Sequence, residues 1–194
     1  MSGSTPNYAF PYPSLTDSPD GASQIQALAS AVDTTLAAQV AALQASISAI
    51  TVPQFALKTA DQSVTSNTTL QNDTALVLPV AANAKYRFES YLDYEASGAG
   101  ALKWQWSVPS GGTLRYAKIG INTGLTAEVV TLTGSAIWTA GGGGAGSLQG
   151  IHMAGTLIMG SSAGNLQLLW AQNASSTTPT IVHAQSLLAL WRIS

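Results

Sequence analysis

The sequence of 194 residues contains no cysteine, and this absence excludes several kinds of site at once. Without thiols the chain cannot form disulfides, use a thiolate as a nucleophile or bind zinc through cysteine. Charged residues make up only 8% of the chain, whereas about 25% is usual in soluble proteins. Because 46% of the residues are hydrophobic, a core can form, and the polar residues are mainly 22 Ser and 20 Thr.

Basic residues are few and scattered. The seven are Lys58, Lys85, Arg87, Lys103, Arg115, Lys118 and Arg192, and with nine acidic residues they give a net charge of −2. No run of them could neutralise successive phosphates, so we expect no nucleic-acid partner. The start, MSGSTPNYAF, lacks signal-peptide features and no 18 consecutive residues are apolar, so we expect a soluble chain made in the cytoplasm, without a membrane partner.

The first 20 residues are rich in proline and aromatic residues, which favours an extended arm. Proline fixes φ and disfavours helix at the residue before it. Tyr8, Phe10 and Tyr12 lie within five residues of one another and could dock such an arm on a partner. The alternative is a disordered terminus, which is common where nothing holds the chain.

A long helix is expected next, beginning near Ser18 and ended by Pro53. Asp17-Ser18-Pro19-Asp20 supplies capping side chains and a proline suited to the first turn. Apolar residues then recur every three or four positions, at Ile25, Leu28, Val32, Leu36, Val40, Leu43, Ile47 and Ile50. This spacing indicates one apolar stripe and predicts a coiled coil over residues 21–52, followed by a linker over 53–61.

Such a stripe has two interpretations, because a helix packed on its own domain also has one apolar face. A helix of about 50 Å is longer than a compact sheet domain of this chain would cover, so we favour self-association. The stripe mixes β-branched residues with leucine, which indicates the number of strands only weakly. Asp33 is the only charged residue in the helix interior, so no salt bridges between helices would set their register.

From Gln62 onward the hydrophobic period changes to two, which is typical of half-buried strands. We expect strands over residues 63–66, 75–80, 85–94, 102–108, 114–121, 127–133, 148–159, 166–172, 179–182 and 187–193. Many short strands and no second long helix predict an antiparallel sandwich of jelly-roll type over residues 62–194. The chain is therefore expected to be mainly β, with one long N-terminal helix.

Two motifs match catalytic or cofactor patterns only literally. Residues 160–164 fit a nucleophile elbow, but the last acid of the chain is Glu128, so no acid stands between Ser162 and His183. The glycines of residues 141–146 have dinucleotide-binding spacing, but neither a helix nor an acid follows at the required distance. We expect no catalytic residue and no cofactor.

The remaining candidates for chemistry are acids and histidines. Glu89, Asp93 and Glu95 project from one face of an expected strand, where paired carboxylates could cleave glycosides. Basic residues share that face, so solvated cross-strand pairs are the simpler interpretation. His152 or His183 could hold a metal on a threefold axis, but a hydrogen-bonded strand residue is simpler, and we expect no metal.

The tryptophans divide into core and ligand candidates. Trp104 and Trp106 share one strand face, which is typical of a core, and Trp170 and Trp191 lie in alternating strands and are also expected to be buried. Trp138 precedes the glycine-rich loop, could lie exposed at a tip and is our candidate ligand-binding residue.

Several segments resemble the minor tail, tail-fibre and head-fibre proteins of phages that infect actinobacteria. The segments similar to the C-terminal β-domain of these proteins are residues 60–73, 78–84, 166–173 and 180–186, together with Tyr86 and Arg192. Gln185 stands where we expect glycine, in the closing hairpin of that domain. Residues 11–20 and 25–33 are similar to the N-terminal arm of the same proteins.

The resemblance implies a non-enzymatic virion component, built as a homotrimer whose residues 1–20 anchor it to other proteins of the tail or capsid. One alternative within this class is a short tail appendage that displays the β-domain, with a host-surface glycan as its ligand. The other is a capsid decoration or head-fibre protein. The alternative outside this class is a glycan depolymerase that uses Glu89, Asp93 or Glu95.

Overall fold

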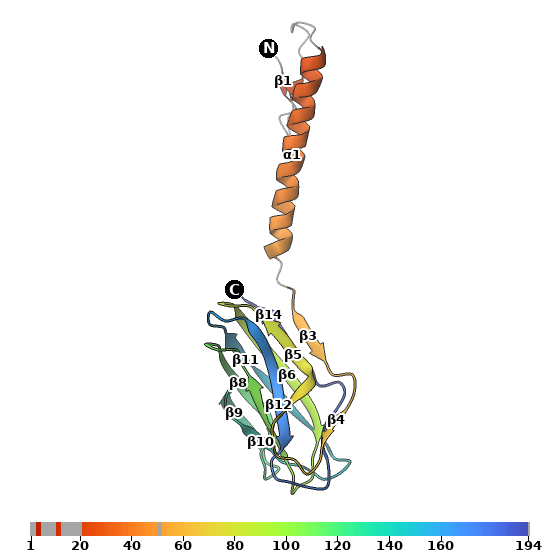
Figure 1. Ribbon diagram of the computed structural model, residues 1–194, viewed down its shortest axis with the longest axis vertical. Coiled ribbons are helices and arrows are strands. Elements are labelled where there is room, and N and C mark those ends of the chain that lie inside the picture. Colours follow the sequence, from red (N-terminus) through yellow and green to blue (C-terminus); the bar gives the residue numbers. More distant parts are fainter. Residues whose placement is uncertain (1–2, 5–10, 13–20, 50–51, 194) are drawn as a thin grey trace. The chain divides into compact units, whose positions relative to one another are not determined.

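The structure is a computed structural model that describes residues 3–4, 11–12, 21–49 and 52–193 (Figure 1). The chain divides into two compact units, which we call the N-terminal unit (Met1–Ile50) and the C-terminal unit (Thr51–Ser194). Mainly β structure with one N-terminal helix and antiparallel, sandwich-like sheets is confirmed. In the described residues no helix combines the length and the apolarity needed to cross a bilayer.

The N-terminal unit contains helix α1 (Gly21–Ala49) and two short strands, β1 (Gly3–Ser4) and β2 (Pro11–Tyr12). At 1.5 Å per residue, the helix is about 44 Å long. The strands pair antiparallel, with Gly3 opposite Tyr12. Within the predicted arm, a backbone ladder thus joins the two segments that the structure describes.

The C-terminal unit contains two antiparallel sheets. Its strands are β3 (Gln54–Leu57), β4 (Gln62–Val64), β5 (Gln71–Val80), β6 (Lys85–Glu95), β7 (Leu102–Ser107), β8 (Thr113–Ile121), β9 (Ala127–Thr133), β10 (Trp138–Ala140), β11 (Leu148–Ile158), β12 (Gly164–Gln172), β13 (Thr180–Val182) and β14 (Leu187–Arg192). The four-stranded sheet has the order β10-β7-β12-β5. The eight-stranded sheet has the path β3-β14-β6-β11-β8-β9, and β13 joins β4 to β6.

Alternate residues of the two sheets form one core. Trp104 and Trp106 of β7 and Trp170 of β12 are fully buried, as predicted. The ring of Phe88, from β6 of the other sheet, meets Trp106 edge to face at 5.1 Å between centroids. Burial of these large rings contributes apolar contact between the two sheets.

Two strands lie where none was expected. Residues 54–57, predicted to be linker, form β3 and pair with β14, with Leu57 opposite Leu187. A four-residue strand carries little periodicity, and its partner lies at the far end of the chain. Likewise β10 has three residues and pairs with β7 next to the glycine-rich loop, where composition favours a loop.

Gln185 occupies a backbone conformation that favours glycine. Its φ is 71°, in the left-handed region, and its N–H donates to the carbonyl of Lys58 at 2.7 Å. A side chain costs about 1–2 kcal/mol there, which explains why glycine is the expected residue at this turn.

A buried ion pair links the two sheets. The Lys58 Nζ, just after β3, lies 2.9 Å from Asp73 Oδ2 of β5, and both side chains are at most 1% exposed. The same oxygen accepts a hydrogen bond from Trp170 Nε1 at 3.0 Å. Oδ1 accepts from the backbone N–H groups of Ala75 and Leu76 at 2.9 and 2.8 Å. The carboxylate is thus bonded on both oxygens, as a buried charge requires.

We predict that Asp73→Ala lowers the free energy of unfolding by about 3–5 kcal/mol, because it leaves the Lys58 ammonium buried without a counter-charge. Urea denaturation followed by tryptophan fluorescence measures this change. The matched control is Asn72→Ala, whose side chain is exposed on the same strand, and we expect it to stay within about 0.5 kcal/mol of the original protein. Equal effects of the two substitutions would contradict a central role for the ion pair.

Candidate assembly interface and surface sites

The apolar stripe of α1 is exposed to solvent in the single chain. Its exposed side chains are Ile25 (70%), Leu28 (41%), Leu36 (55%), Val40 (50%) and Leu43 (62%), and Val32 is half-buried. Helical spacing places these residues along one side of the helix. A row of large apolar groups in contact with water is unfavourable, so the stripe is a candidate assembly interface, which we call the helix stripe.

The rest of the helix surface is also poor in groups that bind water. Asp33 is its only charged residue. The hydroxyls of Thr34, Thr35 and Ser46 donate to backbone carbonyls one turn earlier, at 2.8, 2.8 and 2.9 Å. Because these hydroxyls already donate a hydrogen bond within the helix, they make its surface only weakly polar. Such a surface suits a helix that packs against other chains.

Some predicted assembly and anchoring residues are not placed. Tyr8, Phe10 and Ile50 lie outside the described residues, and so do the side chains of Tyr12 and Ile47. The docking role of the three aromatic residues stays a prediction.

The three acids of β6 lie on one face of the sheet, as predicted, because odd-numbered residues of this strand face outward. The Glu89 carboxylate lies 3.2 Å from Arg87 Nη2 and 3.0 Å from His152 Nε2. His152 is thus a hydrogen-bonded strand residue. The contact with His152 joins neighbouring strands, and the contact with Arg87 lies within β6, so Glu89 is paired on the sheet surface, which fits the simpler of the two interpretations.

His183 lies between two further acids. Its Nδ1 is 3.2 Å from Asp61 Oδ2, and its Nε2 is 3.8 Å from Glu95 Oε2. Asp61 also accepts the backbone N–H of Ala184 at 2.8 Å, and this bond, more than His183, lowers the pKa of its carboxyl. Across the described part of the chain, no group of three His, Asp or Glu residues is arranged to hold a metal ion.

Two tryptophans lie differently from expectation. Trp138 belongs to β10 and is half-buried against the core, with its Nε1 3.5 Å from the carbonyl of Thr133, rather than at an exposed tip. Trp191 is half-buried on the outer face instead of in the core, where it meets Phe55 edge to face at 5.8 Å. The Arg87 guanidinium lies 5.1 Å from its ring centroid. Alternation alone could not show which sheet face Trp191 occupies, and the short strand that contains Trp138 was not expected.

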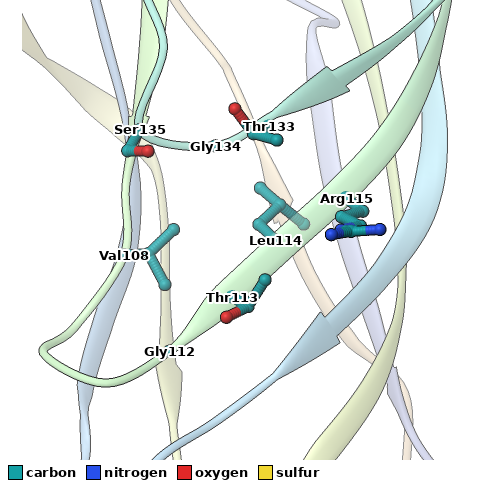
Figure 2. Close-up of a pocket in the computed structure, with 8 residues that line it drawn as sticks. All are labelled: Val108, Gly112, Thr113, Leu114, Arg115, Thr133, Gly134 and Ser135. Carbon is teal, nitrogen blue, oxygen red and sulfur yellow. The ribbon is translucent and has the colours of Figure 1, made fainter.

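A small pocket lies between the start of β8 and the end of β9 (Figure 2). Its volume is about 230 Å³, and it is lined by Val108, Gly112, Thr113, Leu114, Arg115, Thr133, Gly134 and Ser135. Pockets for drug-sized ligands occupy about 300–1,000 Å³, so this one suits at most a small polar group. No sequence motif marks it, because its residues come from two strands and two turns.

Comparisons with known proteins give no family. No family model matches the sequence, and no curated protein matches it. Among solved structures, the chain is similar to that of the infectious bursal disease virus Gx strain, with a TM-score of 0.23 and 12% identity over 73% of this chain and 40% of the other. For the T13 particle of the same virus the TM-score is 0.25, with 10% identity over 73% and 38%.

The VP2 subviral particle of that virus gives a TM-score of 0.22 and 12% identity over 74% of this chain and 41% of the other. This chain therefore spans about two fifths of the length of the structures it matches. Similarities at these TM-scores carry no argument about function.

We predict that the Asp61 carboxyl titrates below its usual pKa of 3.8. A carboxyl whose pKa is lower in the folded than in the unfolded chain stabilises the fold at pH values above the unfolded-state pKa. This stabilisation is lost as the pH falls through the lower, folded-state pKa. Carbon-detected NMR titration of the side chain measures the midpoint. Because the Ala184 N–H is the larger cause, the pKa should stay low in His183→Ala. A midpoint at or above 3.8 in the original protein would refute the assignment.

Proposed function

We propose that this chain is a structural protein of a bacteriophage particle, assembled as a homotrimer into a short fibre or appendage of the minor tail or tail-fibre type. In this proposal α1 forms a three-stranded coiled coil, the N-terminal arm attaches to other virion proteins and the β-sandwich is displayed. The observation that carries the proposal is the exposed helix stripe, which is a surface built for association along the helix axis.

The size of the stripe supports stable assembly. Complete burial of one large aliphatic side chain contributes roughly 1.5–3 kcal/mol. Five stripe residues are between 41% and 70% exposed along a single helix. Even partial burial of this set by neighbouring helices therefore gives several kcal/mol per chain, before the cost of association is subtracted.

The phage assignment draws on the sequence resemblance described above, which covers parts of the arm, the first sandwich residues and the closing hairpin. We further propose that the sandwich is displayed for attachment, with a host-surface glycan as its ligand. Immunogold labelling of particles with antibody against residues 52–194 locates the protein, and label on the capsid would favour the decoration or head-fibre alternative over the tail.

We also propose that the chain has no enzymatic activity. The contacts of Glu89 with Arg87 and His152 support this, because a general acid or base must be available to substrate. A glycosidase would need two carboxyl groups held about 5–10 Å apart across a substrate site.

We predict that the protein has the solution mass of three chains of 19.9 kDa and that Leu43→Asp dissociates it. The substitution places a carboxylate from each chain at one buried level, at a cost of about 3–5 kcal/mol. The concentration needed for half assembly should rise at least about a hundredfold. Sedimentation equilibrium over a concentration series measures it.

The matched control is Ala45→Asp, which adds the same charge to an exposed position on the opposite side of α1. We expect this variant to keep the mass of three chains. A trimer that persists in Leu43→Asp, or a single-chain mass for the original protein, would overturn the proposed assembly.

A further inference from the structure

Exposed apolar side chains are distributed unequally between the two sheets of the sandwich. In the described strands of this unit, the large apolar residues that are exposed are Phe55, Leu57, Tyr91, Ile119, Val129, Leu148 and Ile158. All of them belong to the eight-stranded sheet. A sheet face in contact with water normally carries polar residues, so large apolar side chains exposed on this face are unusual.

The four-stranded sheet provides an internal comparison. The outward residues of its inner strands β7 and β12 include Lys103, Gln105, Asn165 and Gln167, and Thr139 extends this polar surface onto β10. The apolar residues that face outward on this sheet, Val77 and Leu169, are only half-buried rather than exposed. On the eight-stranded sheet, by contrast, exposed large apolar side chains lie among charged residues such as Lys85 and Arg115. The asymmetry indicates that the outer face of the eight-stranded sheet is covered in the assembled protein.

Strand register aligns part of this surface into one row. Residues opposite each other on successive strands are Leu57, Leu187, Tyr91, His152, Ile119 and Val129. This row, which we call the apolar row, crosses from β3 to β9, and at about 4.8 Å per strand it is roughly 24 Å long. Its ends are open to solvent, with Leu57 55% and Val129 69% exposed.

The middle of the row is formed by the Tyr91 ring, and a charged group beside it is already paired. A Cβ at Gly150 would lie only 3.0 Å from the Tyr91 Oη and 3.1 Å from a ring carbon, so the Tyr91 ring lies close over β11. Beside it, Glu89 is already paired with Arg87 and His152. Covering the part of the face around Glu89 would therefore bury a paired carboxylate, which costs less than burying an unpaired one.

Chain connectivity identifies what can cover the face. Helix α1 ends at Ala49, and β3, the first strand of the face, begins at Gln54. Five residues span at most about 18 Å in any conformation. In the proposed trimer, the three copies of β3 are thus held close to the helix ends. A linker this short gives each sandwich an effective concentration in the millimolar range relative to the other two.

We propose that the outer face of the eight-stranded sheet, centred on the apolar row, packs against the β-sandwich of a second copy of this chain. This inference rests on the proposed function, because the helices bring the copies together. The sandwiches then form a second, weaker interface that depends on the first. The sandwiches of the assembly therefore form one joined head rather than three independent domains.

The absence of cysteine allows a direct test in the full-length protein. Ile119→Cys puts a single thiol in the apolar row, and Asn165→Cys puts one on the exposed outer face of the other sheet. We expect maleimide to label Ile119→Cys at least about tenfold more slowly than Asn165→Cys in the native assembly. The two rates should become equal in guanidinium chloride.

A second pair of variants tests the same contact without labelling. Ile119→Lys should raise the concentration for half assembly by at least about tenfold, and Asn165→Lys should leave it unchanged. Equal labelling and unchanged assembly in a trimeric protein would overturn the contact between sandwiches and leave the helix assembly intact. A single-chain mass for the original protein would instead overturn the proposed function, and with it the partner.

Discussion

The sandwich depends on one buried carboxylate. Asp73 lies in the four-stranded sheet and binds Lys58, which follows the first strand of the eight-stranded sheet, so a single charge pair ties the layers together at the point where the chain enters the fold. Trp170 adds a hydrogen bond from β12 to the same oxygen. The end of β3, the start of β5 and one large core ring, Trp170, meet at this cluster.

A second ion pair shows that this chain uses scarce charges inside the fold. Lys118 of β8 pairs with Glu128 of β9, and its Nζ lies 5.5 Å from the ring centroid of Trp104 in the other sheet. It also donates to the carbonyl of Ile121 at 3.0 Å. Two of seven basic residues are therefore buried, and hydroxyl and amide groups are left to solvate much of the outside.

Periodicity was sufficient to predict the helix and the longer strands, because a face that repeats over six or more residues is a local property. It could not predict β3 or β10, which are too short to repeat and are defined by distant partners. The Lys58–Asp73 pair has no motif, since its members meet only when β3 and β5 are placed in separate sheets. The apolar row was equally hidden, because alternation separates two faces of a strand without showing which neighbour each residue meets. The same limit misplaced Trp191, whereas Trp138 was misplaced because β10, which contains it, was not expected.

The near absence of charge on α1 has a consequence for the conditions under which the protein can work. Attraction between ion pairs weakens as salt increases, because the Debye length falls to about 3 Å at 1 M. Apolar burial does not weaken in this way, and sulfate or phosphate even strengthens it. With Asp33 as the only charge of this helix, the helix contacts of the proposed stalk would not weaken when the salt concentration rises.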